Sequence, residues 1–129
     1  MPRRISLDQI DPFTAAYIEA ALWSSNDESD ESGGRPLDET YTPADIAKST
    51  LAQMIEDCAQ FQLANDQDIR INPTKAGHDF WLTRNGHGAG FWDGDWPEEA
   101  GKRLTKFSKK FGYYNLLVGR DGKIHGVKG

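Results

Sequence analysis

The longest periodic apolar pattern in the chain runs from residue 42 to residue 61 and constrains the fold more than any other feature. Its apolar side chains recur at spacings of three and four residues, which places them on one face of a helix. Thr42 is a suitable cap, with Pro43 at the first helical position and Asp45 three residues after the cap. We therefore expect a long helix whose core-facing side carries Ala47, Leu51, Met54, Ile55, Cys58 and Phe61.

Two further segments have helical patterns. Near the start, Asp11 can cap a helix with Pro12 at its first position, followed by the apolar stripe Phe13, Ala16, Tyr17 and Ala20. In the last third, Asp95 and Glu98 fit a capping box and Gly112 is a natural C-terminal cap. That pattern predicts a helix over residues 98–111, with the apolar stripe Ala100, Leu104, Phe107 and Phe111.

The remaining ordered segments read as strands. Residues 80–85 alternate in a way that suits a strand, the glycines at 86, 88 and 90 permit a turn, and Phe91 and Trp92 begin a returning strand. Residues 114–119 and 123–127 form a second predicted hairpin through Asp121 and Gly122. The expected fold is a single α+β domain over residues 1–129, of order ααββαββ, with a short antiparallel sheet packed against helices.

One segment lacks apolar periodicity. Residues 24–41, SSNDESDESGGRPLDETY, contain two adjacent glycines and a run of carboxylates that includes Asp27, Glu28, Asp30 and Glu31. Such a composition predicts a mobile acidic loop.

Composition and charge exclude several classes of protein. The lone Cys58 cannot form an intramolecular disulfide, no apolar run approaches the length of a membrane span, and the polar N-terminus lacks a signal-peptide core. We therefore expect a cytoplasmic protein that does not enter a membrane. The net charge of −5 is unevenly distributed, because residues 102–129 carry eight basic side chains and one acidic side chain. This asymmetry indicates either a contact surface or attraction between two parts of one domain.

The central run AGHDFWLTRNGHGAGFWDG, residues 76–94, resembles a signature of small proteins encoded by phages and prophages. Other segments fit the same pattern, namely AAYIEAALWSS, PLDETYTPADIA, LAQMIEDCAQFQ and LLVGRDGKIHG. The resemblance spans most of the chain and implies a phage accessory protein in the cytoplasm of an infected bacterium. The family supplies no catalytic or cofactor-binding residues to carry over, and the basic helix is this chain's own feature.

The same run contains candidate contact residues. Arg84, Asn85 and His87 form a polar line at the predicted turn, which we interpret as a functional tip. Trp81, Trp92 and Trp96 have two interpretations, since exposed rings beside an arginine would stack on bases or anchor a protein, whereas buried rings would fill the core.

The predicted helix over residues 98–111 carries a basic side opposite its apolar stripe. Its basic residues are Lys102, Arg103, Lys106, Lys109 and Lys110. A row of cations on one helix face can meet phosphates, with an affinity that depends on salt.

Catalytic chemistry has weaker support. His78, His87 and Asp93 are metal-ligand types within one short segment, but their spacing matches no established metal pattern. Cys58 lies on an apolar stripe, where it is a packing residue, and GHGAG lacks the Lys-Ser/Thr pair of a phosphate-binding loop. We therefore expect no cofactor and assign no catalytic residue.

Three functional hypotheses follow. The first is a phage accessory protein that binds a host or phage macromolecule without turnover, such as a defence or DNA-processing component, through its acidic and aromatic-glycine surfaces. The second is a nucleic-acid-binding module that uses the basic helix, Arg84 and exposed tryptophans. The third is a metal-dependent enzyme centred on His78, His87 and Asp93.

Overall fold

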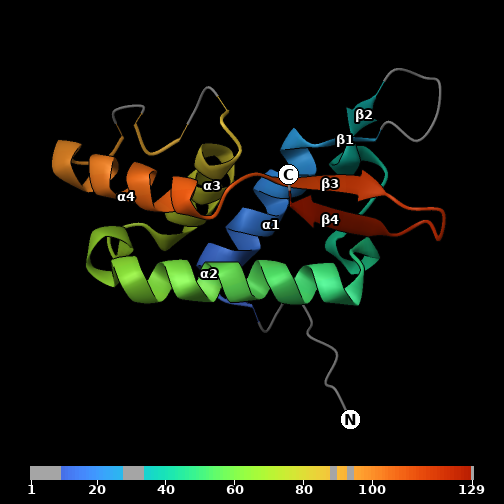
Figure 1. Cartoon of the computed structure of the whole chain (residues 1–129), viewed down its shortest axis with the longest axis horizontal. Coiled ribbons are helices and arrows are strands. Elements are labelled where there is room, and N and C mark those ends of the chain that lie inside the picture. Colours follow the sequence, from blue (N-terminus) through green and yellow to red (C-terminus); the bar gives the residue numbers. More distant parts are fainter. Residues whose placement is uncertain (1–9, 28–33, 88–89, 93–94, 129) are drawn as a thin grey trace, which may run out of the picture.

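A computed structural model describes residues 10–27, 34–87, 90–92 and 95–128 of the chain. Four helices and two short strand pairs make up a mixed α and β fold (Figure 1). The helices are α1 (Pro12–Ser24), α2 (Lys48–Ile69), α3 (Pro73–Arg84) and α4 (Glu98–Lys110). The antiparallel pairs are β1 (Asn26–Asp27) with β2 (Arg35–Pro36), and β3 (Tyr114–Val118) with β4 (Ile124–Lys128).

The centre of the fold is the contact between α1 and α3. A Cβ atom added to Gly77 of α3 would lie 1.9 Å from the carbonyl oxygen of Phe13, so only glycine lets the two helices approach this closely. Around this crossing, α2 packs along α1, and α4 contacts both α2 and α3. Figure 1 shows α4 (orange) and the β3–β4 hairpin (red) at opposite ends of the view, with α2 (green) running beneath both.

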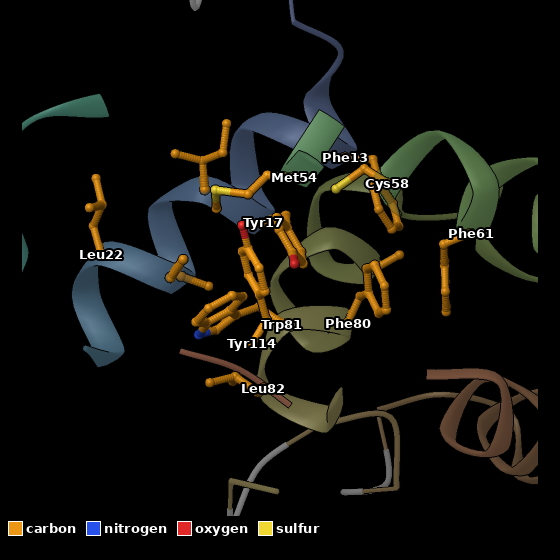
Figure 2. Packing of buried hydrophobic residues seen from close by; sticks show 14 of the residues in the cluster. Phe13, Tyr17, Leu22, Met54, Cys58, Phe61, Phe80, Trp81, Leu82 and Tyr114 are labelled. Carbon is orange, nitrogen blue, oxygen red and sulfur yellow. The ribbon is translucent and has the colours of Figure 1, made fainter. Parts of the chain in front are cut away.

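Aromatic rings fill much of the core (Figure 2). Tyr17 of α1 lies against two residues of α3, with ring centroids 5.2 Å from Phe80 and 5.3 Å from Trp81. Phe61 of α2 stacks on Phe80 at 4.2 Å. Each of these rings buries a large area, which explains how a chain with 37% hydrophobic residues can form a hydrophobic core.

The β3–β4 hairpin is fastened to the start of α2. The backbone N–H of Ala47 donates to the carbonyl of Ile124 at 2.9 Å, and the N–H of Gly126 donates to the Thr50 hydroxyl at 2.9 Å. Ile46 forms an isolated parallel bridge with Ile124. These bonds occupy part of the outer edge of β4 and hold the C-terminal strands against the helices.

Several sequence predictions are confirmed. Asp11 caps α1 by accepting a hydrogen bond from the Thr14 N–H, and Pro12 occupies the first helical position. The C-terminal hairpin forms close to the predicted bounds, and Gly112 takes a positive φ of 72° after α4. The α+β class is therefore correct.

The predicted strands over residues 80–85 and at 91–92 are wrong, and with them the order ααββαββ. Residues 73–84 form α3, which begins at the cap Asn72 with Pro73 at its first position. All five residues from Phe80 to Arg84 are buried. A helix covered on every side shows no 3.6-residue alternation, so its pattern is easily mistaken for that of a covered strand.

Helix starts also differ from the prediction. The Thr42 N–H does donate a hydrogen bond to the Asp45 carboxylate at 2.8 Å, but this capping box closes a single 3₁₀ turn (Pro43–Asp45), and α2 begins only at Lys48. Likewise, α4 begins after Pro97 without a side-chain cap, so the capping box predicted from Asp95 is wrong.

The segment predicted as a mobile acidic loop is ordered at both described ends. Strands β1 and β2 pair there, and a 3₁₀ turn (Leu37–Glu39) buries the Leu37 side chain completely. Glu28, Asp30 and Glu31 lie outside the described residues, as does the side chain of Asp27. No helix in the described part of the chain is long and apolar enough to cross a bilayer.

Candidate functional site

Arg84, predicted at an exposed tip, is instead the polar centre of the core. Its side chain is fully buried, and its Nη1 lies 2.9 Å from both Asp57 Oδ2 and the Tyr17 hydroxyl oxygen. Its Nε and Nη2 donate to the carbonyls of Gly112 and Phe111 at 2.9 and 3.1 Å. Arg84 therefore ties α3 to α1, to α2 and to the end of α4, and it is not available to a ligand.

Burial also sets the protonation state around Arg84. It raises the pKa of the Tyr17 hydroxyl far above its ordinary value, although the nearby Arg84 charge opposes the rise. Tyr17 thus remains protonated at neutral pH and accepts a hydrogen bond from the guanidinium through its oxygen. Burial likewise raises the pKa of the Cys58 thiol, which supports its interpretation as a packing residue.

Trp96 is buried, and its interpretation as an exposed stacking residue is wrong. Its indole Nε1 donates to the buried Asp79 Oδ2 at 2.7 Å. Lys75 approaches the same carboxylate at 3.4 Å and reaches Asp95 at 3.0 Å. Burial alone would lower the pKa of Lys75, but these two carboxylates outweigh it and leave the pKa raised. The cluster fixes the segment before α4 to α3.

Trp81 and Asn85 also stabilise the fold. The buried Trp81 donates from Nε1 to the Ser24 hydroxyl at 2.7 Å. Asn85 donates to the Trp81 carbonyl and accepts a hydrogen bond from the backbone N–H of Tyr114 at 2.8 Å. The N–H of His87 donates to the Leu82 carbonyl. Arg84, Asn85 and His87, which were predicted to form a functional tip, therefore mainly make hydrogen bonds that end α3 and hold it to the rest of the fold.

The described residues that were named for a metal centre, His78 and His87, do not form one in the structure. His78 Nδ1 lies 3.3 Å from Asp79 Oδ1, and the His78 ring packs against Trp23. Within the described ranges no group of three His, Cys, Asp or Glu side chains is placed to hold a metal ion. Asp93 lies outside those ranges.

A groove of about 790 Å³ lies between α4 and the segment that precedes it. Phe91, Trp92 and Trp96 line its aromatic side. Gly101 allows this arrangement, because a Cβ atom there would lie 2.7 Å from the Phe91 carbonyl oxygen. Trp92 is 46% exposed, so it alone among these three rings offers a free face. We call this pocket the α4 groove.

The helical side of the α4 groove is basic. Lys102, Lys106 and Lys109 line it, at spacings of four and three residues that place them on one face over about 10 Å of helix. Lys102 forms an ion pair with Glu98 at 3.4 Å, and Glu98 also lines the groove. Lys106 and Lys109 are exposed and make no ion pair with any described residue.

The other two basic residues of α4 are already engaged. Arg103 forms a two-pronged ion pair with Asp68 of α2, with N–O distances of 2.7 and 3.0 Å. This contact lowers the pKa of the Asp68 carboxyl group. Lys110 lies over the ring of Phe107. Only part of the predicted basic face is therefore free to bind.

The α4 groove also contains an unsatisfied polar atom. The hydroxyl oxygen of Thr105 is buried, and it has no hydrogen-bond partner among the described residues. Thr105 lines the groove between the lysines. Buried polar groups are normally satisfied, so this hydroxyl is an unusual feature of the groove wall.

A second pocket, also of about 790 Å³, lies at the C-terminal end of α4. It is lined by residues from α3, α4 and β4 and by the connection between α4 and β3. The exposed residues in its lining are Gly86, Lys109, Gly112, Tyr113 and Lys128. We call it the hairpin pocket. Lys109 lines both this pocket and the α4 groove.

Sequence reasoning named Arg84, Trp92, Trp96 and the α4 lysines that line these pockets, but it missed Thr105, Tyr113 and Lys128. Thr105 gives no signal in the sequence, because the fold alone determines whether its hydroxyl has a hydrogen-bond partner. Tyr113 has one visible clue, its position directly after the cap Gly112, where the chain leaves the helix.

No family model matches the chain, and neither the curated proteins nor the solved structures give a significant match.

Proposed function

We propose that the chain is a non-enzymatic module that binds single-stranded nucleic acid in the α4 groove. The observation that carries the proposal is the juxtaposition of a half-exposed tryptophan, Trp92, with unpaired lysines across one groove. Bases stack on aromatic faces and phosphates bind lysines, so this pair of features matches the two repeating parts of a single strand.

The groove favours a single strand over a duplex. The exposed face of Trp92 serves as a platform only for a base that is free of its neighbours, as in an unpaired strand. Lys106 and Lys109 supply the electrostatic part of the affinity. Each phosphate that they neutralise makes the binding constant more dependent on salt concentration.

The net charge of −5 does not oppose this assignment, because the charge is segregated. Residues 102–129 contain eight basic side chains and one acidic side chain, and they include all the groove lysines. A local basic surface on an acidic protein steers an anionic ligand to one place and repels it elsewhere. The result is a defined binding face and weak nonspecific binding.

The hypothesis of a phage accessory protein that occupies a host or phage macromolecule remains a prediction. The acidic residues that this hypothesis uses lie outside the described side chains. Most aromatic residues of the aromatic-glycine run are buried in the core. Among the aromatic residues of that run, all of which the structure describes, Trp92 is the one that is exposed. A protein partner that competes for the α4 groove is therefore one outcome of the test.

The test is a fluorescence-anisotropy titration of a labelled 12-nucleotide oligo(dT) with the wild-type protein and matched variants. Trp92→Ala removes the stacking platform and should weaken binding roughly 5- to 150-fold, equivalent to about 1–3 kcal/mol. Its control is Trp23→Ala, which removes a tryptophan that is 55% exposed on α1 and is not part of the groove lining. This control should bind like the wild type.

The electrostatic part is tested by the salt dependence of binding. Replacing both Lys106 and Lys109 by Gln should reduce the slope of log K against log salt by about 1.4, since each phosphate contact to a single strand contributes about 0.7. Lys48→Gln on α2 removes an exposed, unpaired lysine elsewhere and should leave the slope unchanged. Wild-type protein that fails to bind the oligonucleotide at low salt, or that binds it equally well after Trp92→Ala, contradicts the proposal.

A further inference from the structure

The hairpin pocket repeats the chemistry of the α4 groove. Tyr113 is 56% exposed, and Lys128 of β4 is exposed without an ion pair to any residue that the structure describes. Each of the two pockets therefore combines one exposed aromatic ring with unpaired lysine. This second combination involves residues that the proposed function does not use.

The two pockets adjoin at a shared residue. Lys109 lies in the last turn of α4 and lines both of them, so its side chain borders the two pockets. In the sequence, Trp92 precedes α4, Lys106 and Lys109 lie on it, and Tyr113 follows its end.

The backbone on both sides of Tyr113 is anchored. The carbonyl of Gly112 accepts from Arg84 Nε at 2.9 Å, and the N–H of Tyr114 donates to Asn85 Oδ1 at 2.8 Å. The two polar residues at the end of α3 therefore hold the peptide groups that flank Tyr113. Its ring is left outside the core on a fixed stretch of chain.

The Tyr113 ring also packs against a fixed part of the backbone. It packs on Gly86, where a Cβ atom would lie 3.3 Å from the tyrosine hydroxyl oxygen. Gly86 has a φ of 72°, a conformation that other residues rarely adopt, so glycine serves both the turn and the ring. An aromatic ring that is fixed at its base and open on the outside is preorganised for stacking.

We infer that the hairpin pocket is a second subsite for the same strand, in which Tyr113 stacks on a base and Lys128 binds a phosphate. This inference rests on the proposed function of the α4 groove. The strand runs along α4, with Lys109 contacting the phosphates between the two subsites. The affinity of the protein therefore increases when an oligonucleotide becomes long enough to reach both.

The experiment compares oligo(dT) of 2, 4, 8 and 12 nucleotides by competition against the labelled 12-mer. The wild type should show a steep gain in affinity over this series. Tyr113→Leu and Lys128→Gln should each remove most of the gain while changing dinucleotide affinity by no more than about twofold, because either subsite alone still holds a short ligand.

Two matched variants separate stacking and charge from general disturbance. Tyr113→Phe keeps the ring and should retain the gain with length. Lys123→Gln removes an exposed, unpaired lysine from the same hairpin and should also behave like the wild type. Circular dichroism of each variant checks that the hairpin is intact.

The outcomes distinguish the inference from the proposal beneath it. If Tyr113→Leu and Lys128→Gln keep the full gain while Trp92→Ala weakens every length, the α4 groove binds nucleic acid and the second subsite is wrong. If the wild type binds none of the oligonucleotides, the proposed function fails, and this inference fails with it.

Discussion

Breaking the buried ion pair between Arg84 and Asp57 should be among the most destabilising changes in the protein. The Arg84 side chain is fully buried and that of Asp57 is 6% exposed. Removing one member of such a pair leaves the other charge buried without compensation, at a cost of about 3–5 kcal/mol. Asp57→Leu and Arg84→Met should therefore each remove a large share of a stability that is about 5–15 kcal/mol for a typical domain.

The double variant measures the coupling. Asp57→Leu with Arg84→Met removes both charges and replaces them with apolar side chains of similar size, so it should cost less than the two single changes added together by about 2 kcal/mol or more. Tyr17→Phe provides a milder probe, because it removes only one acceptor from the guanidinium, at about 1.5–3 kcal/mol. This variant remains informative if either single charge variant fails to fold.

Urea unfolding followed by tryptophan fluorescence supplies these free energies, and an unchanged m-value shows that the variants unfold from a native state of similar compactness. Arg103→Met is the control, since it breaks an exposed ion pair with Asp68 and should have a much smaller effect. Single changes costing less than about 1 kcal/mol, or a double variant additive to within about 0.5 kcal/mol, would refute the assignment of Arg84 to the core.

Three further predictions concern the fold. Gly77→Ala should destabilise severely or abolish folding, measured by thermal circular dichroism, because its methyl group would overlap the Phe13 carbonyl oxygen; a melting temperature within a few degrees of the wild type contradicts the helix contact. Trp96→Phe should cost about 1–3 kcal/mol in urea unfolding by leaving the buried Asp79 short of a donor, and a neutral result removes that hydrogen bond from the account. The folded-state pKa of Asp68 is lowered, so its stabilisation is present above the ordinary value of 3.8 and is lost as pH falls through the lowered pKa; acid titration should thus destabilise the wild type more than Asp68→Asn.

Helix α1 is buried over most of its surface, and its start could be predicted from the cap Asp11 and from Pro12. Helix α4 could be predicted because it has an apolar stripe on one face and solvent on the other. Leu104 lies on the inner face, and Lys102 and Lys106 lie on the outer face. Helix α3 could not be predicted, because all residues of its second half, 79–84, are buried and show no periodic signal. The start signal at Asn72 and Pro73 was visible in the sequence, but it equally fits a turn.

Arg84 illustrates the same limit for the candidate site. An arginine near three glycines suggests an exposed tip, and nothing local indicates that Asp57, 27 residues earlier, supplies a buried carboxylate. Trp92 and Trp96 are also alike in sequence, yet one is half-exposed and the other is bonded to Asp79. Contacts between distant residues decide these cases, and local patterns do not record them.

The most direct test of nucleic-acid binding at the α4 groove is a ¹⁵N–¹H NMR titration of the protein with unlabelled 12-nucleotide oligo(dT). The four tryptophans give four indole N–H signals, and their environments differ, since Trp81 and Trp96 are bonded inside the core while Trp23 and Trp92 are exposed on different parts of the surface. We predict that the Trp92 indole and the amides of Lys106 and Lys109 shift, while the Trp81 and Trp23 indoles stay in place. Shifts confined to Trp23 and its surroundings, or no shifts at saturating oligonucleotide, would contradict the account.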